Sequence, residues 1–170
     1  MYASFCLVKW AECINRVRGD WLVSEQEAQV SLGFITVVDH DELGCIGGYL
    51  ILNLGGRPLE FHCTAPVRAN RAQQILYGVS LKPFLYGELV GRSLVEKALE
   101  TPIAIIANQP ELNSLQSLID VPLIQVDDVE HSQSAVIHDL QIFMETIPID
   151  EPFGRITDAI EEARRGARAA

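Results

Sequence analysis

The sequence predicts an α/β fold with α+β character, in which an antiparallel β-hairpin block over about residues 34–65 packs beside a short βαβ unit over about residues 103–126. Apolar, β-branched runs separated by turn residues predict the hairpin block. An apolar run, a helical segment and a second apolar run with short connections predict the βαβ unit. Apolar residues at helical spacing predict amphipathic helices at both ends. We therefore expect one domain over residues 1–150 and, over residues 151–170, a C-terminal helix that is a candidate for a separable element.

The N-terminal helix is expected over residues 3–18, where Cys6, Trp10 and Val17 lie on one apolar stripe. Three strands of the hairpin block are expected to follow, over residues 34–38, 49–54 and 59–65. The acidic segment 39–44 is expected to end the first of these strands in a turn.

The glycine pair at 55–56 predicts a two-residue hairpin turn between the second and third strands, because glycine readily adopts positive φ. Such a turn pairs Leu52 with Leu59 and Leu50 with Phe61, which places apolar residues opposite each other. A loop one residue longer would set Leu52 against a charged side chain. The predicted buried face of the hairpin therefore consists of Leu50, Leu52, Leu59, Phe61 and Cys63.

Helical segments are expected after the hairpin block. Asn70 is a candidate N-cap for a helix that ends near Gly78, and a second helix is expected over residues 86–99, ended by Pro102. The βαβ unit is expected to contain a strand, a helix and a strand over residues 103–106, 110–119 and 123–126. Residues 129–150 fit either a helix or a strand.

The C-terminal helix carries an apolar stripe of Phe153, Ile156 and Ile160. This stripe must be buried, either on the protein's own domain or on a protein partner or second copy of the chain. Prolines just before and within the start of the helix indicate a hinge between it and the preceding residues.

The composition and charge of the chain argue against several classes of function. A chain of 170 residues with 48% hydrophobic content can build one core without disulfides or metals. Its formal net charge of −10 argues against nonspecific binding to nucleic acid or to an anionic membrane surface, because both require clustered cations. No apolar run approaches the length of a membrane-spanning helix. Four cysteines without a CxxC pair, and no secretion signal, predict reduced thiols in a cytoplasmic protein: Cys6, Cys13, Cys45 and Cys63.

Charge is unevenly distributed along the chain. Residues 57–97 hold six Lys or Arg against three acids, whereas residues 98–154 hold ten acids and no Lys or Arg. Such a distribution fits a middle segment that pairs with its acidic neighbours on the folded surface, and it also fits an anion-binding face. Arg68, Asn70 and Arg71 are the candidate ligand-binding residues, because arginines at a helix N-terminus suit a phosphate or carboxylate.

Glu60 and His62 are candidate catalytic residues. Side chains at i and i+2 lie on the same face of a strand, so this carboxylate and imidazole are expected to meet. Cys63 points to the opposite face and is expected to pack in the core, so a Cys–His nucleophile pair is not predicted. A structural hydrogen bond between Glu60 and His62 is the alternative.

Carboxylates follow two of the predicted strands. Asp39 and Asp41 follow the first strand of the hairpin block, and Asp127 and Asp128 follow the last strand of the βαβ unit. Mg²⁺ prefers oxygen ligands, and α/β proteins often place such ligands at the carboxyl ends of strands. These four aspartates are therefore the candidate metal ligands.

An apolar strand that runs into an Asp-x-Asp sequence resembles the nucleophile motif of the haloacid-dehalogenase-like phosphatases. The resemblance implies Asp39 as nucleophile, Asp41 as acid and base, Lys97 on the phosphoryl group, and Asp127 and Asp128 on Mg²⁺. It covers two short motifs, and the residues after Asp41 depart from the family pattern.

No complete catalytic constellation is present in the sequence, which leaves open whether the chain is an enzyme. The leading hypothesis is a non-catalytic regulatory or assembly module that needs no cofactor. One alternative is an Mg²⁺-dependent phosphoryl-transfer enzyme that uses the acidic strand ends. Another is a domain that binds a small anionic ligand.

Overall fold

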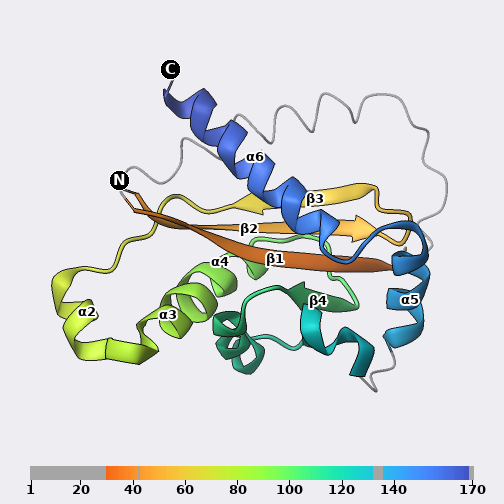
Figure 1. Cartoon of the computed structure of the whole chain (residues 1–170), viewed down its shortest axis with the longest axis horizontal. Coiled ribbons are helices and arrows are strands. Elements are labelled where there is room, and N and C mark those ends of the chain that lie inside the picture. Colours follow the sequence, from red (N-terminus) through yellow and green to blue (C-terminus); the bar gives the residue numbers. More distant parts are fainter. Residues whose placement is uncertain (1–29, 42, 132–135, 169–170) are drawn as a thin grey trace.

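The computed structural model describes residues 30–41, 43–131 and 136–168. The helix predicted over residues 3–18 and its two cysteines lie outside these residues. A five-stranded mixed sheet forms the centre of the fold, in the order β3-β2-β1-β4-β5 (Figure 1). Its strands are β1 (Ser31–His40), β2 (Gly44–Asn53), β3 (Pro58–Cys63), β4 (Ala104–Ala107) and β5 (Leu123–Gln125).

The α-helices are α2 (Arg71–Tyr77), α3 (Leu81–Pro83), α4 (Arg92–Val95), α5 (Ile137–Thr146) and α6 (Glu151–Arg168). Tighter 3-10 helices form η1 (Gly78–Ser80), η3 (Pro110–Leu118) and η4 (Val126–His131), and a wider π-helix forms η2 (Phe84–Gly91). The helix expected over residues 86–99 therefore begins earlier, is π-helical up to Gly91, and ends at Val95.

The predicted fold class is confirmed. Strands β1, β2 and β3 pair antiparallel as successive hairpins, and β4 and β5 pair parallel around η3. Strand β4 also pairs parallel with β1, so the hairpin block and the βαβ unit share one sheet. The segment between β4 and β5 is a 3-10 helix where an α-helix was expected.

Strand β1 is longer than the sequence predicted. It does not end at residue 38, because Asp39 pairs with Cys45 and His40 pairs with Gly44 in the antiparallel ladder to β2. The acidic segment that was expected to form only a turn therefore begins inside β1.

The turn between β2 and β3 corrects one prediction. Asn53 donates its backbone N–H to the Arg57 carbonyl at 3.0 Å, which leaves a three-residue loop that ends at Gly56 with φ +74°. Leu52 then pairs with Pro58 instead of Leu59. Three-residue hairpin loops commonly place a residue with positive φ at this position.

A β-bulge restores the predicted register beyond that turn. Leu59 is the extra residue, after which Leu50 pairs with Phe61 as expected. Phe61 and Cys63 pack on the same cluster as Leu50, but the bulge turns Leu59 to the opposite face of the sheet. On the predicted face, Leu50 and Leu52 are thus buried and Phe61 and Cys63 are partly buried, whereas Leu59 lies on the other face.

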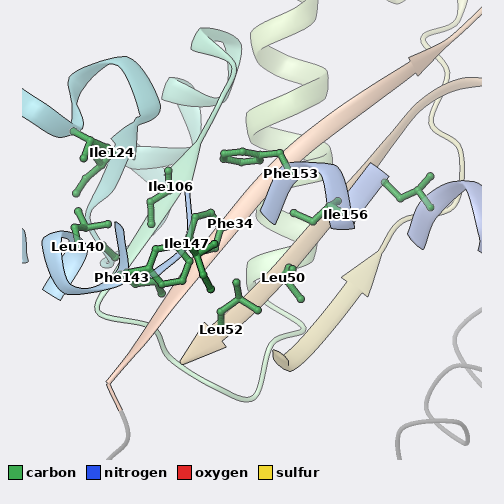
Figure 2. Close-up of a cluster of buried hydrophobic side chains, with 14 of the residues drawn as sticks. Phe34, Leu50, Leu52, Ile106, Ile124, Leu140, Phe143, Ile147, Phe153 and Ile156 are labelled. Atoms are coloured by element: carbon green, nitrogen blue, oxygen red, sulfur yellow. The ribbon is translucent and has the colours of Figure 1, made fainter. Parts of the chain in front are cut away.

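Helices cover both faces of the sheet. On one face, α5 and α6 pack over Phe34, whose ring lies 5.3 Å from the ring of Phe143 and 5.7 Å from that of Phe153 between centroids (Figure 2). On the other face, η2, α4 and η3 pack over a second cluster that includes Tyr49 and Ile105. The ambiguous segment 129–150 is thus helical where α5 lies.

Two adjacent glycines of β2 let helices approach the sheet closely from both sides. A Cβ atom at Gly47 would lie 2.1 Å from Cγ1 of Val90, and one at Gly48 would lie 2.2 Å from Cγ2 of Ile156. A larger side chain at either position would push a covering helix away from the sheet.

The C-terminal helix α6 packs on the protein's own sheet. Phe153, Ile156 and Ile160 are buried in the same cluster as Phe34 and Leu50. Contact of this stripe with a partner stays a prediction, and it would require α6 to leave the sheet. In the described part of the chain, no helix has the length and apolar character needed to cross a membrane.

Candidate functional site

Glu60 and His62 meet on β3 as the sequence predicted. His62 Nε2 lies 2.6 Å from Glu60 Oε1, and the two side chains are 18% and 14% exposed. The Glu60 carboxylate also accepts the backbone N–H groups of Leu99 at 3.0 Å and Glu100 at 2.9 Å. Glu60 therefore fastens the loop after α4 to the sheet.

The pKa of Glu60 reflects these contacts. Burial opposes its ionisation, but the hydrogen bonds from Glu100, His62 and Leu99 outweigh burial and hold the pKa below its ordinary value. A carboxylate that is ionised and saturated with donors from its own chain is a poor general base.

Tyr49 lies across the ladder from His62 and is fully buried. Its hydroxyl finds no hydrogen-bond partner among the described residues. Burial, and then the charge of Glu60, raise the pKa of Tyr49, so the phenol stays neutral. Gly33 makes room for this ring, because a Cβ there would lie 2.7 Å from the hydroxyl oxygen.

Asp39 is held by residues of the helical segment. Tyr86 Oη donates to Asp39 Oδ2 at 2.5 Å, and Lys82 Nζ lies 3.6 Å from the same oxygen. Burial and the hydrogen bond to Asp39 raise the pKa of Tyr86. The cation beside Asp39 is thus Lys82, whereas Lys97 is exposed in the turn after α4.

The acidic strand ends lie apart. Asp127 and Asp128 are exposed in η4 after β5, and β4 separates β5 from β1 in the sheet. Two strand spacings put the backbones of Asp39 and Asp127 roughly 10 Å apart or more. In the described ranges, no group of three or more His, Cys, Asp or Glu residues is placed to hold a metal ion.

The candidate anion-binding residues are occupied by contacts within the chain. Asn70 caps α2 as predicted, because its side chain accepts from the Gln73 backbone N–H and its own N–H donates to the Gln73 side chain. Arg68 donates to the backbone carbonyl of Asp41, and Arg71 to the Gln74 side chain. The hydrogen-bond donors of Arg68, Asn70 and Arg71 therefore already contact acceptors of the same chain.

A surface that the sequence did not single out lies just beyond these residues. We use "the arm" for α2 and η1, residues 71–80. Within the arm no residue is buried, and Ile75, Leu76 and Val79 are 67%, 81% and 101% exposed. In Figure 1, α2 stands away from the sheet at one end of the molecule.

The arm is a formed structure in spite of its exposure. The capping box at Asn70 fixes its start, and Gly78 ends α2 with a positive φ of 50°. Tyr77 stacks on Phe84 with ring centroids 4.2 Å apart, which ties the arm to η2. The arm thus presents apolar side chains on a preformed helix.

Comparison of the sequence with known protein families found no matching family, and comparison with curated proteins found no match. In sequence, the apolar residues of the arm look like those of any packed helix. The signal that could have drawn attention to them is charge, since residues 61–87 contain three Lys or Arg and no acid.

Proposed function

We propose that the protein is a non-catalytic assembly module that associates with further copies of itself through the arm. The observation that carries this proposal is the exposure of Ile75, Leu76 and Val79 on a capped helix. Burial of a side chain of this size is worth about 1.5–3 kcal/mol, so a partner that covers all three gains a substantial driving force. Contiguous exposed apolar residues are typical of interaction sites.

The polar candidates support a non-catalytic role. Glu60, His62 and Asp39 each use their side chains to hold helices or loops of the same chain. Neither an Mg²⁺-dependent phosphoryl transfer nor an anion-binding role gains support from the contacts of the described residues. Assembly requires none of these groups to be free.

We place this activity in the cytoplasm as part of the proposal. Cys45 is a free and buried thiol. Free thiols in a folded domain suit a reducing compartment.

Sedimentation velocity over a range of protein concentrations tests the proposal. The wild-type chain should show mass above that of one chain, 18.8 kDa, and the excess should rise with concentration. Leu76→Gln combined with Val79→Gln should abolish it, because glutamine keeps helix propensity but removes the apolar surface. Leu99→Gln is the matched control, since Leu99 is 90% exposed but lies outside the arm.

A wild-type chain that stays at 18.8 kDa at every concentration would contradict the proposal. So would an arm variant that associates as the wild type does, or a control variant that is as impaired as the arm variant.

A further inference from the structure

We infer that the arm docks on the acidic end of a second copy, so that the chains assemble head to tail. "The acidic end" denotes η4 and α5 with the residues up to Asp150. This inference rests on the proposed function and names the surface that receives the arm.

Charge complementarity supports the pairing. The arm, residues 71–80, carries one charged residue, Arg71, and no acid, whereas residues 98–154 contain ten acids and no Lys or Arg. Arg71, the cation of the arm, contacts an amide side chain and no carboxylate in the described structure. Opposite potentials on two surfaces favour their association and fix its register.

The carboxylates of the acidic end are available on the surface. Asp127, Asp128 and Glu145 are exposed, and none of the three forms an ion pair with a described residue. Exposed charges of one sign repel each other, and an approaching cation such as Arg71 relieves that repulsion.

The acidic end also offers apolar contact. Ile142 and Met144 of α5 are 38% and 36% exposed, although Leu140 and Phe143 of the same helix are fully buried. Ile142 lies on the same side of α5 as Glu145, and Leu76 and Val79 of the arm would meet Ile142 there. A short helix seated on another amphipathic helix is a common mode of recognition.

The two surfaces cannot meet within one chain. Figure 1 shows α2 and α5 at opposite ends of the long axis of the molecule. Contact between different surfaces of successive copies is heterologous, and it produces a ring if the rotation closes or a filament if it does not. The arm has only ten residues, fewer than the 20–30 residues per side of a standard interface, so each contact is expected to be weak.

Other occupants fit the charge pattern less well. The amphipathic segment predicted over residues 3–18 contains Lys9, Arg16 and Arg18 against Glu12, and its net positive charge opposes docking beside Arg71. A symmetric arm-to-arm contact would bring two copies of Arg71 together.

Charge reversal tests the inference. Arg71 is the first residue of α2, where a glutamate interacts favourably with the helix dipole, so Arg71→Glu should keep the helix. Both Arg71→Glu and Glu145→Lys should weaken self-association at least about tenfold in sedimentation velocity, whereas Asp158→Lys on the exposed side of α6 should leave it within about twofold.

Mixing the two variants tests whether the arm of one copy docks on the acidic end of another. In an equimolar mixture, the Arg71 arm of one variant meets the wild-type acidic end of the other, and the reversed arm meets the reversed acidic end. Association should therefore recover to within about threefold of the wild type in the mixture, and also in the Arg71→Glu/Glu145→Lys double variant.

Failure of the inference is distinguishable from failure of the proposed function. If Glu145→Lys associates as the wild type while the apolar arm variant does not, the arm assembles the protein but docks elsewhere, and the inference is wrong. Lack of recovery in the mixture would overturn it as well. A wild-type protein without self-association would refute the proposed function itself.

Discussion

Replacement of Glu60 by glutamine tests whether this carboxylate fastens the loop after α4. Three hydrogen bonds converge on its oxygens, from His62 and from the backbone N–H groups of Leu99 and Glu100. A hydrogen bond to a charged group contributes about 1.5–3 kcal/mol and one between neutral groups about 0.5–1.5 kcal/mol. Glutamine removes the charge and one acceptor, so Glu60→Gln should lower the free energy of unfolding by roughly 2–4 kcal/mol at neutral pH.

The effect should depend on pH with a defined sign. The pKa of Glu60 is lower in the folded protein than in the unfolded chain. Its contribution to stability is therefore fully present above the unfolded pKa of about 4.3, and it is lost as the pH falls through the folded value. The stability difference between wild type and Glu60→Gln should shrink over that acidic range.

Urea denaturation followed by circular dichroism measures the change in stability, and hydrogen exchange of the Leu99 and Glu100 amides measures the local release of the loop. Glu96→Gln is the matched control, because Glu96 contacts Arg92 at 2.6 Å but is 58% exposed and should matter little. Equal midpoints for wild type and Glu60→Gln, with unchanged exchange of both amides, would refute the assigned role of Glu60.

Three further predictions concern the core. Gly48→Ala should destabilise the fold by about 1–3 kcal/mol, because its Cβ would overlap Ile156. Gly154→Ala in α6 should stabilise the fold by roughly 0.5–1 kcal/mol, because no atom lies within 4 Å of the new Cβ. Thermal denaturation of both variants checks these two changes. A chain truncated after Ile149 should lose most of its cooperative unfolding transition, because each buried apolar side chain of α6 contributes about 2 kcal/mol or more. A sharp transition near that of the full chain would show that α6 is separable. Cys45 should react with a maleimide far more slowly in the native than in the unfolded protein, since it is buried and burial raises its pKa; equal rates would contradict its placement.

Local sequence patterns accounted for much of the fold. The requirement that apolar residues face each other was enough to pair Leu50 with Phe61, although the predicted turn was one residue too short, and the two-residue period of β3 brought Glu60 beside His62. Asn70 and Gly78 marked the ends of α2, because each residue type satisfies a specific backbone requirement there. These features depend on residues within a few positions of each other, where steric rules act directly.

Features that depend on distant residues were not predictable in the same way. The turn at Gly56 and the bulge at Leu59 compensate each other, and either alone would shift the whole strand. Strand β1 extends through Asp39 only because β2 continues beside it.

The sequence did not predict the exposure of Leu76 either. A capped segment with apolar residues normally packs on its own core, and only the position of α2 relative to the sheet shows that this one does not. The Glu60 contacts with Leu99 and Glu100 likewise join residues about forty positions apart, which no local pattern encodes.

Side-chain footprinting with a photoactivated carbene, at dilute and at concentrated protein, reports directly on the contact between the arm and the acidic end. If the arm of one copy sits on the acidic end of the next, labelling of Leu76 and Val79 should fall at high concentration together with labelling of Ile142. Labelling of Leu99, which is exposed outside both surfaces, should stay constant. Labelling that is independent of concentration at Leu76, Val79 and Ile142, or a decrease at Leu99 alone, would contradict assembly through the arm.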